Sequence, residues 1–410
     1  MTTETITTPT NPAAAAAPTF VVAVAHSQDV DSTRAAQELV AQLEAGLADR
    51  TPRAALLYAG IDHDHAAVLG ALGRRWPGLA LIGCTTDGES SSVEEFQEDS
   101  LTVVVFAGDG VPIAAGLGRD VSRDPAAATR AAVEHARTAL SCEPTLCVTT
   151  PESLTTSAVG IIAGLRDALG TTFPILGGVA GDQWRSVRTF QFFGTDVLSD
   201  ACPVLLFGGP LKFSVGVSSG WRPIGRPSTV TRVDGNIVRE IDGRPAADYY
   251  RGYLGDQIGS ALSSGVFLGE YPLAVTDPAD GQRQYLRAPF AIDPESGAMT
   301  FVADVPLGAT VQLTEAQRDD ILRASRVSVE EARQSYPGDS PAAALFFSCA
   351  ARKQILGTRT AQEARLLRES LDPAIPMCGF YAYGEIGPFR PGAVSHFHNE
   401  TFVTLLLGVD

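Results

Sequence analysis

Short apolar runs alternate with helical patterns along the first part of the chain. Residues 20–25 form a run of apolar and β-branched side chains, which is typical of a buried strand. From Ala36 to Leu47 apolar residues recur every three or four positions, which is the spacing of an amphipathic helix. The strand pattern returns at 54–58 and again at 79–84. This alternation favours an α/β fold.

The third of these strands leads into a glycine turn, and the same arrangement returns near the C-terminus. Gly83 and Glu89 are joined by a Gly-x-x-x-x-Gly-Glu spacing, and so are Gly379 and Glu385. Apolar runs flank both copies, and a weaker third copy occupies about residues 145–193. Each copy has the order strand, helix, strand, glycine turn, strand. The sequence therefore predicts an internally repeated architecture.

The pattern changes from residue 203 onward, where strand signals dominate. The pair Asp234-Gly235 lies between two apolar runs, which predicts a tight β-hairpin. Further strands are predicted at 286–292, 299–302 and 310–313. We therefore expect a mixed α/β (α+β) fold. Repeated β-α-β-β units form mixed sheets covered by helices, and an antiparallel β-rich region lies in the middle.

The hydrophobic pattern weakens around residues 255–264, and we place a domain boundary there. The chain then divides into a disordered tail at 1–19, an N-terminal domain at 20–255 and a C-terminal domain at 256–410. The tail is rich in Thr, Ala and Pro, and no Lys or Arg precedes its apolar residues 13–17. This composition does not match a secretion signal, so we expect a cytoplasmic protein.

Charge and hydropathy exclude several classes of partner. The formal net charge of the 410-residue chain is −16, and an acidic surface repels phosphate backbones and anionic lipids. No run approaches the roughly 18 apolar residues that a membrane-spanning helix requires. We therefore expect neither a nucleic-acid partner nor an integral membrane segment.

Catalytic signals are sparse. The six cysteines are scattered without a Cys-x-x-Cys pair, which argues against a zinc ribbon and a disulfide framework. Cys84 and Cys349 each follow a predicted strand, and the charge of Arg352 could lower the pKa of Cys349. No nucleophile elbow, phosphate-binding loop or dinucleotide fingerprint occurs. We expect a protein that is not an enzyme, with catalysis by Cys349 or Cys84 as an alternative.

Several segments together resemble one known family. They are residues 82–89, 234–246, 347–352, 379–388 and 398–401. They resemble the FIST family over about residues 20–410, which covers its N-terminal and C-terminal modules. The resemblance implies a sensory module that binds small ligands, with amino acids suggested. Family members often stand beside or are fused to signalling output domains. This chain has no room for a fused kinase or cyclase, so we expect a separate output partner.

The candidate ligand-binding residues lie mainly in the last repeat. They are Arg352, Tyr383, Glu385, His398 and Asn399, together with Trp221 and Glu89. A guanidinium can bind a carboxylate through two hydrogen bonds, a glutamate can accept from an ammonium, and an amide can do both. This set would suit an amino-acid-like ligand. Alternatively, Arg352 and Glu385 pair with each other and fasten the repeat, and Trp221 covers the edge of the core.

A haem-binding sensor of nitric oxide or redox state is a further alternative. The resemblance implies it, because some family members are reported to bind haem. Neutral His396 or His398 could ligate iron, and Tyr381, Phe389 and Phe397 could face a porphyrin. No haem-attachment motif is present, and both histidines could equally point outward from a strand edge. We therefore expect no cofactor and no metal.

Overall fold

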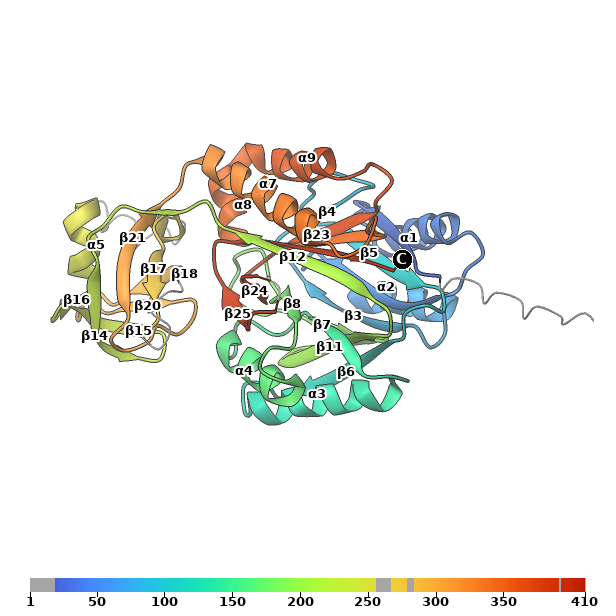
Figure 1. The fold of residues 1–410 in the computed structure, drawn as a ribbon, viewed down its shortest axis with the longest axis horizontal. Helices are drawn as coiled ribbons and strands as arrows, with labels where there is room; N and C mark the ends of the chain where they lie inside the picture. Colours follow the sequence, from blue (N-terminus) through green and yellow to red (C-terminus); the bar gives the residue numbers. More distant parts are fainter. Residues whose placement is uncertain (1–18, 256–266, 279–283, 391, 410) are drawn as a thin grey trace, which may run out of the picture.

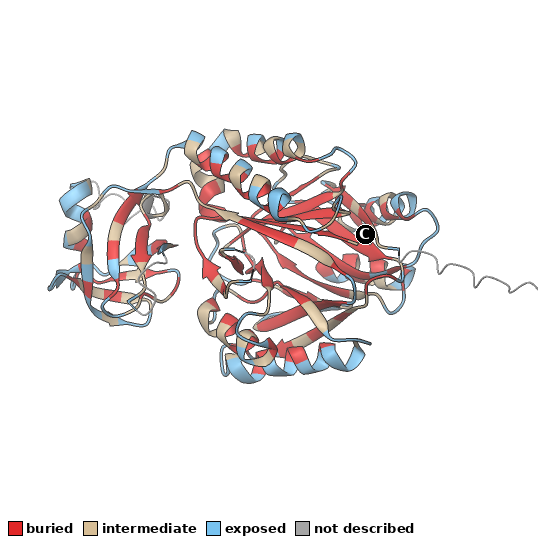
Figure 2. Ribbon diagram, viewed as in Figure 1, coloured by how far each residue is buried: buried red, intermediate tan, exposed pale blue. Residues whose placement is uncertain are grey.

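The computed structural model describes residues 19–255, 267–278, 284–390 and 392–409. A large body of sheets and helices lies beside a smaller β domain (Figure 1). The strands of the body are buried, and its helices expose their outer faces (Figure 2). Mixed sheets with covering helices confirm the predicted α/β class.

Two of the predicted regions touch segments outside the described residues. The tail at 1–19 lies outside them except for its last residue. The proposed boundary between residues 255 and 256 lies at the edge of the range 256–266, which is also outside them. In the part of the chain that the structure describes, no helix is long and apolar enough to cross a membrane.

The body contains three units of the same kind. The first consists of β1 (Val21–Ser27), α1 (Ser32–Leu47), β2 (Pro52–Ala59), α2 (His65–Arg75), β3 (Ala80–Thr85) and β5 (Leu101–Ala107). Asp31 begins α1 by accepting hydrogen bonds from the Thr33 and Arg34 backbone amides, and the apolar stripe of α1 packs on the sheet. Strands β2 and β3 are parallel, whereas β5 lies antiparallel between β1 and β2.

The second and third units repeat this order. The second consists of β6 (Ile113–Arg119), α3 (Pro125–Ala139), β7 (Pro144–Thr149), α4 (Ala158–Leu169), β8 (Ile175–Gly178) and β11 (Ala201–Gly208). The third consists of β12 (Lys212–Ser218), α7 (Arg318–Ser335), β22 (Ala343–Cys349), α8 (Ala350–Leu356), η2 (Gly357–Arg359), α9 (Thr360–Ser370), β23 (Met377–Ala382) and β26 (Phe402–Gly408). The inner faces of all three sheets share one apolar core.

Strands that follow the glycine turns interlock the units. They are β4 (Glu89–Ser91), β9 (Gln191–Phe193) with β10 (Asp196–Leu198), and β24 (Glu385–Pro388) with β25 (Ser395–His398). The sheet orders are β1-β5-β2-β3-β9-β10, β25-β24-β8-β7-β11-β6 and β12-β26-β22-β23-β4. Each unit therefore lends its turn strand to a neighbouring unit, in a cycle.

The two turns identified from their spacing are equivalent, as predicted. Gly83 in β3 lies opposite Leu57, and Gly379 in β23 lies opposite Phe346, in the same parallel pairing. A Cβ atom at either glycine would overlap the carbonyl oxygen of the opposite residue, so close strand packing requires glycine at both places.

The small domain is inserted into the third unit between β12 and α7. Its elements are β13 (Arg222–Pro223), β14 (Ser228–Asp234), β15 (Ile237–Ile241), β16 (Arg244–Pro245), α5 (Ala246–Leu254), η1 (Phe267–Glu270), β17 (Leu273–Thr276), β18 (Gln284–Arg287), β19 (Pro289–Ile292), β20 (Met299–Phe301) and β21 (Thr310–Glu315). All of its strand pairs are antiparallel, which confirms the predicted β-rich middle region. The predicted hairpin at Asp234-Gly235 joins β14 to β15.

Candidate functional site

A cavity of about 390 Å³ lies where the small domain meets the body. The body contributes residues 153–158, which precede and begin α4, together with Tyr383, Asn399 and Glu400. The small domain contributes, among others, Thr300 and Phe301 of β20 and Val302, which follows that strand. Arg287 of β18 joins the two parts, because its Nη1 donates to the Phe397 carbonyl of β25 at 3.2 Å. Clefts between domains are common places for small ligands.

Four residues that line this cavity carry five buried polar atoms that have no hydrogen-bond partner among the described residues. They are Oε1 and Oε2 of Glu400, Nδ2 of Asn399, and the hydroxyl oxygens of Ser153 and Ser157. Glu400 is fully buried and Asn399 is 1% exposed. Each unsatisfied group costs on the order of 1–3 kcal/mol. Proteins rarely retain several such groups together without a function, so the wall is suited to a bound polar molecule.

The backbone holds Glu400 in an unusual conformation. Its φ is 59°, in the left-handed region that residues other than glycine seldom occupy. Asp99 and Asp200 have φ values of 52° and 55° at the corresponding places, just before β5 and β11. Asp200 accepts from Ser122 and Asp99 accepts from Gln183, whereas neither side-chain oxygen of Glu400 has a partner in the described part of the chain. The turn is thus common to all units, and the buried, unpaired acid belongs to the third.

Two further acidic groups lie beside Glu400. Oε2 of Glu385 accepts from the backbone amide and the hydroxyl of Thr401, at 3.1 and 2.8 Å. Burial raises the pKa of Glu385 to about 8. Burial, followed by the charge of Glu385, raises the pKa of Glu400 well above its usual range. Burial and both glutamates also raise the pKa of the Cys349 thiol. Burial therefore disfavours the ionised form of all three groups.

Tyr383 lies on the cavity wall, as a ligand-binding candidate should. Its hydroxyl donates to Asp182 Oδ1 at 2.6 Å and accepts from the Trp184 backbone amide. Trp184 also lines the cavity, and its ring centroid lies 5.5 Å from that of Tyr383. Trp184 is not among the residues predicted from the sequence. It follows the glycine turn of the weaker third copy, and that turn is the sequence feature that could have indicated it.

A second polar group lies on the other side of Trp184. The indole Nε1 of Trp184 donates to Asp87 Oδ2 at 2.9 Å, and Lys353 Nζ lies 3.0 Å from the same oxygen. Lys353 also donates to Glu98 at 2.8 Å. Burial raises the pKa of Asp87 to about 6, while Lys353 opposes that change. The Lys353 ammonium is thus paired with the carboxylates of Asp87 and Glu98, which leaves it poorly placed to bind a ligand.

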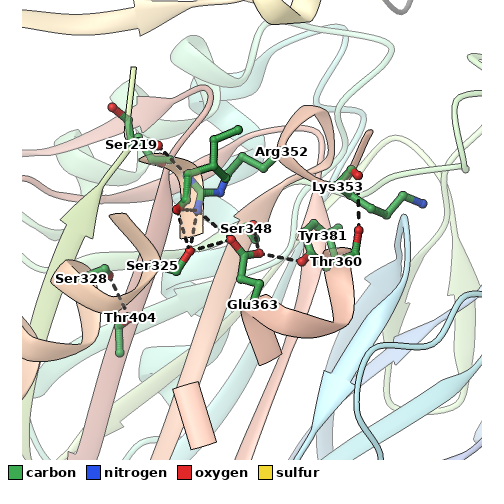
Figure 3. A network of polar contacts seen from close by, with 12 residues as sticks. Ser219, Ser325, Ser328, Ser348, Arg352, Lys353, Thr360, Glu363, Tyr381 and Thr404 are labelled. Carbon is green, nitrogen blue, oxygen red and sulfur yellow. Dashed lines mark hydrogen bonds and ion pairs between the residues drawn. The ribbon is translucent and has the colours of Figure 1, made fainter. Parts of the chain in front are cut away.

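Arg352 does not line the cavity, and it belongs to a buried network that Figure 3 shows. Its Nη2 lies 2.7 Å from Glu363 Oε1, and Glu363 also accepts from Tyr381 and Ser348. The expected alternative, an Arg352–Glu385 pair, is wrong because Glu363 is the partner. The network fastens α8 and α9 to β22 and β23, so Arg352 has a structural role here.

Three other candidates also lie outside the cavity lining. Glu89 is fully buried and accepts from the hydroxyls of Thr86 and Ser100. Burial raises its pKa to about 7. Trp221 donates to the carbonyl of Glu270 at 3.2 Å and packs in an apolar cluster, as the core-edge alternative expected. Glu385 lies behind the wall and holds Thr401.

The geometry of β25 explains why the histidines do not reach the cavity. Side chains alternate along a strand, so Phe397, which lines the cavity, lies on the opposite face from His396 and His398. His398 Nε2 bonds the Gly387 carbonyl at 2.8 Å, and its ring lies against Phe389 with centroids 4.4 Å apart. Neither histidine lines the cavity, so the haem alternative finds no support at this site.

The chain belongs to the FIST family. The FIST N domain matches residues 53–244, and the FIST C domain matches residues 246–388. FIST domains are sensory domains of signal transduction rather than catalytic ones.

Similar proteins include several mycobacterial ones. An uncharacterized protein of Mycobacterium tuberculosis (strain ATCC 25618 / H37Rv) is 32% identical over 90% of this chain and 94% of its own length. One of Mycobacterium bovis is 31% identical over 87% and 92%. A crystal structure of a cyanuric acid hydrolase from A. caulinodans covers 95% of this chain and 99% of its own, at 9% identity and a TM-score of 0.38. That score supports no functional conclusion.

Proposed function

We propose that this protein is a cytoplasmic sensory module that binds a small polar molecule between its body and its small domain, and signals to a separate protein. The observation that carries the proposal is the set of five buried polar atoms, on residues that line the cavity, for which the described residues supply no hydrogen-bond partner. A ligand that satisfied several of them would recover part of the free energy that their burial costs.

Binding without turnover is the activity that the side chains favour. A cysteine attacks as its thiolate, but burial raises the thiol pKa of both Cys349 and Cys84. The hydroxyls of Ser153 and Ser157 have no basic side chain bonded to them among the described residues. We therefore propose that the ligand is released unchanged.

The position of the cavity suggests how binding is transmitted. Asn399 and Glu400 belong to the body, whereas Thr300 and Val302 belong to the small domain. A ligand that contacts both sides would tighten the joint that Arg287 already makes. An output protein that reads the arrangement of the two parts would then respond. Hydrogen exchange at 284–304 and 395–400 should slow when ligand is added.

A screen with a blocked cavity tests the binding proposal. Amino acids, amines, carboxylic acids, sugars and nucleosides are tested for a rise in melting temperature. A ligand at a hundred times its Kd should stabilise the fold by about 2.7 kcal/mol. Val302→Trp adds a ring at the cavity wall and should abolish the shift. Leu307→Trp is the control, because Leu307 is exposed and does not line the cavity. Equal binding by both variants would refute the proposed site.

A further inference from the structure

We propose that the cavity selects a small organic ammonium ion, a primary or secondary amine on an apolar body, in preference to an amino acid. This inference rests on the proposed function and specifies its ligand.

The ionisable carboxyl groups on the cavity wall have no basic counterpart. Asp304 and Glu400 are the acidic side chains among the described lining residues, and no Arg, Lys or His lines the cavity there. The two nearby guanidinium groups are engaged elsewhere: Arg352 with Glu363, and Arg287 with the carbonyls of Asp304 and Phe397. The carboxylate of an amino acid would therefore meet no cationic partner. An amine that lacks this carboxylate brings only its ammonium group, which can interact with the carboxyl groups of Asp304 and Glu400.

Five aromatic side chains also line the cavity. They are Trp184, Phe290, Phe301, Tyr383 and Phe397. The faces of aromatic rings attract cations, and such rings also cover the apolar part of an amine. Aromatic rings together with a buried carboxylate are the combination that recognises organic cations.

Glu400 favours an amine that carries N–H groups. Its two side-chain oxygens have no partner among the residues that the structure describes. A primary ammonium has three N–H donors, whereas a quaternary ammonium has none. A metal ion is a poorer fit, because the described residues contain no group of three His, Cys, Asp or Glu side chains placed to hold one. The ligand that satisfies the site is thus a protonated amine.

Binding should release a proton. The protonated carboxyl of Glu400 loses its proton to solvent as the ammonium arrives, which leaves a carboxylate–ammonium pair. The groups around Glu400 are Glu385 of β24, Cys349 at the end of β22 and Arg352 of α8, while η1 approaches through Gly269. Glu385 disfavours the ionised form and Arg352 favours it. Affinity for the amine should therefore rise with pH over the range in which Glu400 of the free protein is protonated.

Calorimetry with matched probes tests the inference. The probes are 2-phenylethylamine, its neutral analogue 2-phenylethanol, and phenylalanine, which adds a carboxylate to the amine. The amine should bind at least about tenfold more tightly than either analogue. Titration of the wild type in buffers of different ionisation enthalpy should show net proton release. This last measurement requires no variant to fold.

Two substitutions assign the effect to Glu400. Glu400→Gln should weaken amine binding about ten- to a hundredfold and leave binding of the alcohol unchanged. Asp99→Asn removes a charge from the corresponding turn of the first unit, outside the cavity, and should leave both unchanged. Three results would each overturn the inference: phenylalanine binds as tightly as the amine, binding releases no proton, or Glu400→Gln keeps full affinity for the amine.

The screen separates this inference from the proposed function. If the amine does not bind but another screened compound does, and Val302→Trp blocks binding of that compound, only this inference is wrong. If no screened compound binds, the proposed function fails with it.

Discussion

Replacing Glu385 by glutamine should make the free energy of unfolding less dependent on pH. The carboxyl is fully buried, and its pKa is raised from 4.5 to about 8 by that burial. A carboxyl whose pKa is higher in the folded than in the unfolded protein makes its full contribution to stability at pH values where it is protonated in both the folded and the unfolded state. That contribution is lost as the pH rises from about 4.5 to about 8, because the unfolded chain ionises first.

The size of the effect follows from the proton difference. Between these pH values the folded state holds about one more proton at Glu385 than the unfolded state does. The free energy of unfolding then falls by about 1.4 kcal/mol per pH unit, or roughly 3–5 kcal/mol across the window. Glu89 and Asp87, with pKa values of about 7 and about 6, act in the same direction. Glu385→Gln should therefore reduce the slope rather than abolish it.

The second unit indicates that glutamine fits this place. Gln191 pairs with Cys84 of β3, as Glu385 pairs with Gly178 of β8, and its Oε1 accepts from the Ala201 amide at 3.2 Å. The reciprocal change, Gln191→Glu, puts a carboxyl beside Glu152, whose Oε2 lies 3.2 Å from the Gln191 amide nitrogen.

Urea denaturation followed by circular dichroism between pH 5 and pH 8 gives the slopes. Glu385→Gln should flatten the pH dependence by about 1.4 kcal/mol per unit, and Gln191→Glu should steepen it. Identical slopes for the wild type and Glu385→Gln would refute the reasoning, because they would mean that Glu385 is already ionised in the folded protein.

Two other predictions concern packing and the buried ion pair. Gly379→Ala should lower the free energy of unfolding by about 1–3 kcal/mol, because its Cβ would overlap the Phe346 carbonyl. Gly252→Ala, in α5 with open space around it, should instead raise it by about 0.5–1 kcal/mol, and equal urea midpoints for both would contradict this. Arg352→Met should cost about 3–5 kcal/mol by leaving Glu363 unpaired, and adding Glu363→Gln should recover part of it in a double-mutant cycle. A fully additive cycle would rule out that coupling.

Local spacing predicted the repeats because the requirement behind them is local. Two features recur at fixed positions in the first and third units. One is a glycine that lies opposite the carbonyl of the neighbouring strand, and the other is a buried glutamate at the start of the next strand. In the second unit the buried position at the start of the next strand is filled by Gln191. A longer loop precedes β9, and spacing alone cannot count residues across an insertion.

Partners distant in sequence are decided by the tertiary fold. Arg352 and Glu385 carry opposite charges, which makes them plausible partners in the sequence. In the structure α9 brings Glu363 to Arg352, and Glu385 is held by Thr401. A charge has no preferred partner until packing sets the distances, because the interaction depends on separation and local dielectric.

The sequence by itself determined the strands and helices, the α/β class, the family and two residues of the cavity wall, Tyr383 and Asn399. The hydrophobic period and the glycine spacing are properties of residues close together in the chain, so both can be recognised in the sequence. Only the tertiary structure placed the small domain against the body and brought Trp184, Ser157 and Glu400 to the same cavity. That cavity exists because several separate segments pack around a space they do not fill, and no single segment encodes it.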